Sequence, residues 1–225
     1  MKKYICIFYI LSCYFNVFAH ESHYKNISKI EMDVLRNDKI IGYSNYFFKR
    51  DKDIMIVENY TKFAVEMFGV KVFSINSESK EIYQKDMLIS FESKTLQNEK
   101  SKFVKLNFNK NKNKFIINGS SYVGEASIDN IIGNWWNSKI LDTKTQISPL
   151  SGSIKKQEVK LTNKDQIDYK GKIVKLFKFK LKSTEDLPDD KKLDFDIWLD
   201  PNKSIIYKVK YNRLGSWEYR LKNYE

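Results

Sequence analysis

The sequence predicts an all-β protein: a single strongly curved antiparallel sheet or partly open barrel of about ten or eleven strands, with one short helix. Three observations lead to this prediction. Apolar and polar residues alternate with a period of two over most of the chain, which is typical of half-buried strands. Short polar segments separate these stretches at hairpin spacing. Helical spacing of apolar residues stands out at 127–137.

The first half of the chain shows the alternation less regularly than the second. Polar turns at 36–38 and 50–53 separate apolar stretches, and Phe68-Gly69 permits a bend after a long strand candidate. The loop 148–153 contains Pro, Gly and Ser and could mark a boundary. Because the strand pattern is alike on both sides of it, we expect residues 20–225 to form a single antiparallel β domain.

The second half alternates most clearly between residues 177 and 222. Aromatic and aliphatic residues there occupy every second position, and lysines or acids fill the positions between them. One set should therefore face the core and the other the solvent. We expect burial of Phe177, Phe179, Ile197, Val209 and Tyr219, and exposure of Lys178, Lys180 and Lys208.

The segment 127–137 has apolar residues at helical spacing, and Ser127 is suited to cap a first turn. A curved sheet needs something to fill its concave side, so we expect this segment either to cover a ligand groove as a lid or to plug it permanently. On a helix, two adjacent Trp side chains cannot face the same way, so one of them is a candidate for a pocket mouth or a membrane-contacting position. The candidate ligand-binding residues are Ile128, Ile131, Ile132, Trp135 and Trp136.

The N-terminus has the layout of a secretory signal peptide, which we expect to span residues 1–19. A basic start precedes an uncharged apolar run that ends at Ala19. Two alternatives are an uncleaved anchor and lipidation at Cys13. We expect a periplasmic protein that begins at His20. Both cysteines, Cys6 and Cys13, lie in this segment, so the mature chain should contain no disulfide.

The formal net charge is +12, yet only four of the forty basic residues are arginine. Nucleic-acid recognition relies on the bidentate arginine fork, so we expect no nucleic-acid partner. A solvated lysine-rich surface is the simplest interpretation. Peripheral contact with an anionic membrane is the alternative.

No motif specifies a reaction, and we expect no catalytic residues, no metal site and no cofactor. His20 and His23 are the only histidines, and an N-terminal histidine could chelate copper. Acids at 194, 196 and 200 alternate with apolar residues, as they do on a solvent face. The stretch 119–124 resembles a nucleophile elbow, but its second glycine comes one residue late. An enzyme is therefore the least favoured class.

Several fragments, taken in order, resemble an uncharacterised family of secreted bacterial proteins, a domain of unknown function. The resemblance implies a shape like the curved, partly open β-barrel of periplasmic lipoprotein carriers, and it assigns no catalytic residues. The fragments are Ile41-Gly42-Tyr43, Phe68-Gly69-Val70-Lys71-Val72-Phe73, Ile82-Tyr83, Met87-Leu88, Ser93-Lys94-Thr95, Asn134-Trp135-Trp136-Asn137, Ile197-Trp198-Leu199-Asp200 and 215–221.

These observations predict an exported, non-enzymatic cell-envelope protein. The leading hypothesis is that a lipid or other apolar ligand, or a lipidated protein, binds in the groove of the curved sheet. The alternative is a structural or assembly factor that acts through protein–protein contacts. A wide apolar cavity would favour the first hypothesis, and a filled interior would favour the second.

Overall fold

The computed structural model describes residues 24–189 and 191–225. The predicted signal peptide, both cysteines, His20 and His23 lie outside the described residues, so export, cleavage after Ala19 and lipidation at Cys13 stay predictions.

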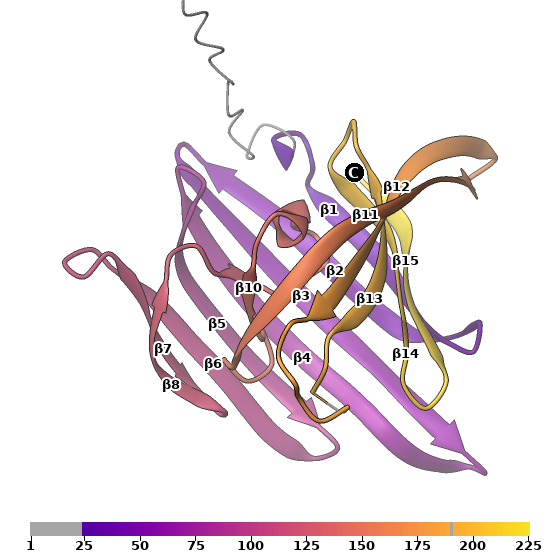
Figure 1. Ribbon diagram of the computed structural model, residues 1–225, viewed down its shortest axis with the longest axis horizontal. Coiled ribbons are helices and arrows are strands. Elements are labelled where there is room, and N and C mark those ends of the chain that lie inside the picture. Colours follow the sequence, from indigo (N-terminus) through magenta and orange to yellow (C-terminus); the bar gives the residue numbers. More distant parts are fainter. Residues whose placement is uncertain (1–23, 190) are drawn as a thin grey trace, which may run out of the picture.

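The described residues form fifteen strands and one 3-10 helix, η1, in a single sheet arrangement (Figure 1). The strands of the first half are β1 (Lys29–Arg36), β2 (Lys39–Asp51), β3 (Ile54–Met67), β4 (Val70–Gln84), β5 (Met87–Gln97), β6 (Lys100–Asn109), β7 (Lys114–Gly119) and β8 (Tyr122–Ser127). The remaining elements are β9 (Ile131–Ile132), η1 (Ser138–Leu141), β10 (Thr145–Ile147), β11 (Ile154–Tyr169), β12 (Lys172–Ser183), β13 (Asp194–Asp200), β14 (Ile205–Asn212) and β15 (Ser216–Tyr224).

The strand order is β8-β7-β6-β5-β4-β3-β2-β1-β15-β14-β13-β12-β11-β10-β9. The first and last strands of the chain, β1 and β15, pair in the middle of the sheet, and β8 and β9 form its two edges. Only residues 128–130 connect these edges, and a segment of that length spans at most roughly 14 Å. The sheet must therefore curl until its edges approach each other, although it does not close.

The curl places the two halves of the chain on opposite sides of a common core. In Figure 1, β1–β8 form a broad layer, and β11–β15 cross it at a different angle. The largest buried cluster contains Phe91 and Leu106 from the first half, and Leu176 and Ile205 from the second. Ile132 from the connecting segment lies in the same cluster. The residues between β8 and β11 are thus part of the core.

The all-β prediction and the single curved sheet are confirmed, but the expected strand number was too low. Strands β9 and β10 have two and three residues, which is too short for an alternating pattern to be recognised. The sheet is also mixed, because β9 and β10 pair in parallel. Every other strand pair that the structure describes is antiparallel.

The predicted helix over 127–137 was wrong. Ser127 ends β8, Ile131–Ile132 form β9, and the four-residue η1 follows at Ser138–Leu141. The backbone at Ile131 and Ile132 pairs with β10 at Gln146 and Ile147. Ile131 and Ile132 pack into different buried clusters. A segment lying between two layers buries side chains on both sides, and this burial produced the apolar spacing that resembled a helix.

The burial expectations for the second half hold in part. Ile197 and Val209 are fully buried, whereas Phe177, Phe179 and Tyr219 are half-buried. The three lysines expected to be exposed are also half-buried. The Nζ atoms of Lys178 and Lys208 lie 4.8 and 4.1 Å from the ring centroid of Trp198, so their stems cover this aromatic side chain.

Two leucines on neighbouring strands test the assignment of inner and outer faces. Leu106 in β6 is fully buried, whereas Leu96 in β5 is 46% exposed. Replacing Leu106 with Ala should lower the free energy of unfolding by about 2–5 kcal/mol, because it leaves a cavity in the core. The matched change Leu96→Ala should cost less than about 0.5 kcal/mol. Urea unfolding of both variants measures the difference, and equal losses would contradict the assigned faces.

Candidate functional site

The five predicted ligand-binding residues do not line one common groove. Ile131, Ile132 and Trp136 are buried, and Ile128 and Trp135 are half-buried. Ile132 and Trp136 belong to the largest core cluster, and Ile131 belongs to a second. The segment thus inserts its side chains into two separate clusters.

The adjacent tryptophans contact different aromatic residues. The Trp136 ring lies 5.3 Å from Tyr24, 5.3 Å from Phe48 and 5.8 Å from Tyr83, between ring centroids and in edge-on geometry. The Trp135 ring lies 5.0 Å from that of Phe195. Such pairs stabilise a fold beyond simple burial.

The buried side chain of Glu81 in β4 forms hydrogen bonds with residues 134 and 136. Its Oε1 accepts hydrogen bonds from Trp136 Nε1 at 2.9 Å and from Asn134 Nδ2 at 2.6 Å. Its Oε2 accepts a hydrogen bond from the Tyr83 hydroxyl at 2.5 Å. Burial raises the pKa of Glu81 to about 7, although these three hydrogen bonds favour the charged form and limit the rise.

Further polar contacts anchor the rest of the segment. Gln157 Nε2 of β11 donates to the carbonyl oxygen of Ile140 at 2.8 Å, and Gln157 Oε1 accepts from Gln146 Nε2 at 2.6 Å. The Ser138 backbone N–H donates to the Tyr24 hydroxyl at 3.1 Å. We call residues 131–147 the inner segment; its backbone and side chains are bonded to β4 and β11 and to Tyr24.

The inner segment leaves little space beside it. A cavity of about 20 Å³ is bordered by Tyr24, Met55, Tyr83 and Trp136 among others. That volume holds roughly one water molecule, whereas pockets for small organic ligands occupy about 300–1,000 Å³. An apolar ligand at this position would therefore have to displace part of the inner segment.

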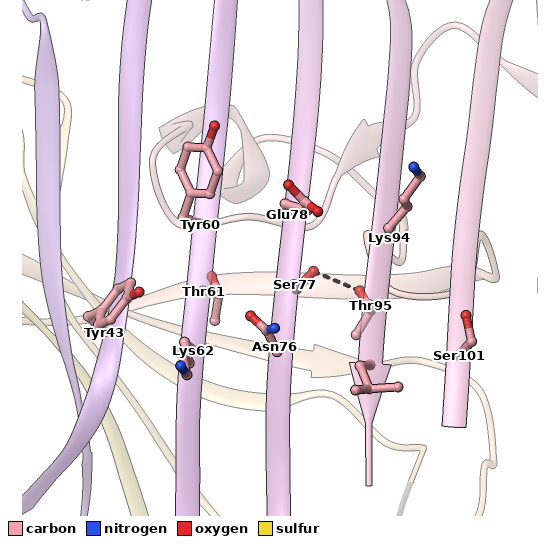
Figure 2. Close-up of a pocket in the computed structure, with 11 residues that line it drawn as sticks. Tyr43, Tyr60, Thr61, Lys62, Asn76, Ser77, Glu78, Lys94, Thr95 and Ser101 are labelled. Atoms are coloured by element: carbon pink, nitrogen blue, oxygen red, sulfur yellow. Dashed lines mark hydrogen bonds between the residues drawn. The ribbon is translucent and has the colours of Figure 1, made fainter. Parts of the chain in front are cut away.

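A larger depression of about 410 Å³ lies on the outer face of β2–β6 (Figure 2). We call it the outer depression. Two exposed rings, Tyr43 and Tyr60, border it, together with the side chains of Lys62, Glu78 and Lys94. The remaining lining residues are Thr61, Asn76, Ser77, Thr95, Leu96 and Ser101.

The strand register explains why the surface is hollow there. Tyr43, Lys62, Asn76, Leu96 and Ser101 face one another in a row across β2–β6. Two side chains in this row are short: Asn76 stands between Lys62 and Leu96, and Ser101 ends the row beside Leu96. On the inner face the intervening positions carry hydroxyls, and Ser77 Oγ lies 2.6 Å from Thr95 Oγ1.

Three charged side chains around the outer depression are not paired within the described part of the protein. In the part of the chain that the structure describes, the side chains of Lys62, Glu78 and Lys94 make no ion pair with each other or with other residues. The sequence analysis missed this surface, because alternation identifies outward positions but not which of them are neighbours across five strands.

The acidic residues considered from the sequence have structural roles. Asp194 and Asp196 form ion pairs with Lys180 at 2.5 and 3.3 Å. Asp200 Oδ1 accepts the backbone N–H of Asn202 at 2.9 Å and so caps a turn. Ser120 lies in the turn between β7 and β8, where its Oγ accepts the backbone N–H of Phe103 at 2.6 Å. Within residues 24–189 and 191–225, no three His, Cys, Asp or Glu side chains gather as a metal site.

Residues 32–222 match the family model of a domain of unknown function, DUF6134. The chain belongs to this family. No curated protein matches its sequence. Among solved structures it is similar to a β-barrel-like protein of domain of unknown function DUF1849 from Brucella abortus, with a TM-score of 0.61 and 9% identity. The match covers 88% of this chain and 97% of that one.

At such low identity the structural likeness shows the fold alone. The match to DUF6134 confirms the expected resemblance to a domain of unknown function. The expected likeness to lipoprotein carriers stays a prediction. In the described part of this DUF6134 protein, no helix is both long and apolar enough to cross a membrane.

The raised pKa of Glu81 predicts a pH dependence of stability. Between pH 4.5 and 7 the folded protein retains a proton on Glu81 that the unfolded chain has released, so the free energy of unfolding should fall as the pH rises. The loss attributable to Glu81 should be about 3 kcal/mol over this range.

The variant Glu81→Gln isolates this contribution, because a neutral amide resembles the protonated acid. Urea unfolding across the pH range should show a weaker pH dependence for this variant than for the wild-type protein. Parallel pH profiles for the two proteins would mean that Glu81 is ionised throughout.

Proposed function

We propose that this protein is a non-enzymatic factor of the cell envelope that binds a partner protein on the outer face of its sheet. The observation that carries the proposal is the hydrogen bonding of the inner segment in the core: Glu81 of β4 bonds to Asn134 and Trp136, and Gln157 of β11 bonds to Ile140. Enclosing an apolar ligand would require breaking these bonds. A core held by such bonds favours a protein that binds its partner on an external surface.

The outer depression is the surface that suits a protein partner. It combines two exposed tyrosine rings with cationic, anionic and amide groups. Tyrosine is enriched at protein interfaces, because its ring buries a large area and its hydroxyl remains able to form hydrogen bonds. The unpaired Lys62, Glu78 and Lys94 could pair with charges on an extended segment of the partner.

The hypothesis of an interior lipid remains open to a direct test with a fluorescent fatty acid. We expect no saturable binding to the wild-type protein, because the inner segment occupies the interior. Trp136→Asp should unfold the protein, since it places a second carboxylate beside Glu81 in the core. Trp136→Phe should fold with a loss of about 1–3 kcal/mol, because it leaves Glu81 one donor short. Saturable binding of the probe would instead favour the lipid hypothesis.

Crosslinking in cells tests the outer depression. A photoreactive amino acid placed at Tyr60 should crosslink to a discrete envelope protein. The same amino acid at Leu161, which is 54% exposed on β11, serves as the control. A single product at Tyr60 and none at Leu161 would support the proposal. Identical products at both positions, or no product at either, would contradict it.

A further inference from the structure

Phe68, in the hairpin turn Phe68-Gly69, is unusual in two respects: its bulky side chain is at positive φ, and it is exposed to solvent. Five two-residue turns connect strands with both residues at positive φ: Asn37-Asp38, Phe68-Gly69, Lys85-Asp86, Asn98-Glu99 and Lys170-Gly171. Four of them begin with a polar residue. Phe68 adopts φ 52°, a conformation that bulky side chains rarely accept, and its side chain is 99% exposed.

This turn lies at the tip of a projecting hairpin. The pairing of β3 with β2 ends at Phe63, and the pairing of β4 with β5 begins at Ile75. Between these two residues the hairpin pairs with neither β2 nor β5, and its turn reaches the lower right of Figure 1. The tip is apolar: exposed Met67, Val70 and Val72 accompany Phe68.

Two other hairpin ends lie at the same end of the molecule. The β14–β15 turn carries Leu214, which is 90% exposed, and Ile40 is exposed where β2 begins. The Arg36 guanidinium donates to the Leu214 carbonyl oxygen and so joins these two hairpins. The rings of Phe63 and Phe73, at the base of the projecting hairpin, lie 5.8 and 6.0 Å from Trp217 in β15. We call Ile40, Met67, Phe68, Val70, Val72 and Leu214 the apolar end.

Basic residues surround the apolar end. Lys39, Lys71 and Arg213 are exposed beside its tips, and Arg36 is half-buried behind them. The acids in the same stretches, 36–41, 66–72 and 212–216, are Asp38 and Glu66. Within these stretches four cations and two anions leave an excess of two positive charges, and Arg213 also donates to the backbone oxygens of Asp189 and Lys192. Separate apolar tips flanked by cations match the interface of an anionic bilayer, where side chains enter between headgroups and cations meet phosphates.

We propose that the apolar end docks on the surface of an anionic lipid bilayer, with Phe68 and Leu214 entering the interface. The proposal rests on the proposed function only for the envelope location. Its site is separate from the outer depression. An exposed Phe in an unfavourable turn conformation makes sense as a feature retained for contact, because Asn would suit the turn better.

Vesicle sedimentation with the purified protein tests the docking. The wild-type protein should bind vesicles that contain phosphatidylglycerol and bind pure phosphatidylcholine vesicles more weakly. Phe68→Asn should lower the apparent affinity about tenfold or more, because it removes the inserted ring. Its melting temperature should stay the same or rise, since Asn favours this turn. A residue retained only for folding would show the opposite pattern.

Three further variants make the test specific. Phe103→Asn applies the same change to an aromatic residue on the outer face of β6 and should leave vesicle binding unchanged. Leu214→Asn, also at positive φ, should weaken binding without unfolding the protein. The double variant Lys39→Gln, Lys71→Gln should reduce the preference for phosphatidylglycerol.

Two results would overturn the docking proposal. One is the absence of wild-type binding to either kind of vesicle, which would leave the apolar end to a protein partner. The other is equal binding by the wild-type protein and by Phe68→Asn. Neither result affects crosslinking at Tyr60, so the two proposals fail independently.

Discussion

The bond between Glu81 and the inner segment is the interaction on which the rest of the structure depends. A strongly curved sheet has an inner face that must be covered, and its own side chains fill it completely only in narrow barrels. Here residues between the two edge strands return through the interior. Polar groups inside a core need partners. Glu81 accepts hydrogen bonds from the side chains of Asn134 and Trp136, while Tyr24 and Gln157 bond to backbone groups of Ser138 and Ile140. The inner face is thereby closed by the chain itself.

This closure moves the search for function to the outside of the molecule. Two exterior features stand apart from an ordinary solvated surface. The outer depression gathers three charged side chains, Lys62, Glu78 and Lys94, that form no ion pair within the described part of the chain, and the apolar end exposes side chains that would normally be buried. Both arise from strand register or strand length. Neither depends on a catalytic motif, which agrees with the absence of such a motif from the sequence.

Local sequence rules predicted the strands well where each strand has one buried face. Ile197 and Val209 alternate with polar neighbours and are buried. The same rules misjudged 127–137, because its residues face two different clusters and their apolar spacing reflects both. Of the candidate residues there, Ile131, Ile132 and Trp136 are buried, and Ile128 and Trp135 are half-buried against the same clusters. Glu81 gave no signal at all, because a single acid within an alternating strand looks the same whether its strand faces solvent or core.

The sequence by itself determined the all-β class, the hairpin turns and the lack of a recognisable catalytic or metal motif, because these follow from period-two alternation, turn residues and the inventory of side chains. The tertiary structure decided the pairing of β1 with β15, the closure of the interior by the inner segment, and the grouping of Ile40, Phe68 and Leu214 at one end. These features depend on which distant residues become neighbours. A one-dimensional pattern records the direction in which a side chain points but not what it meets there.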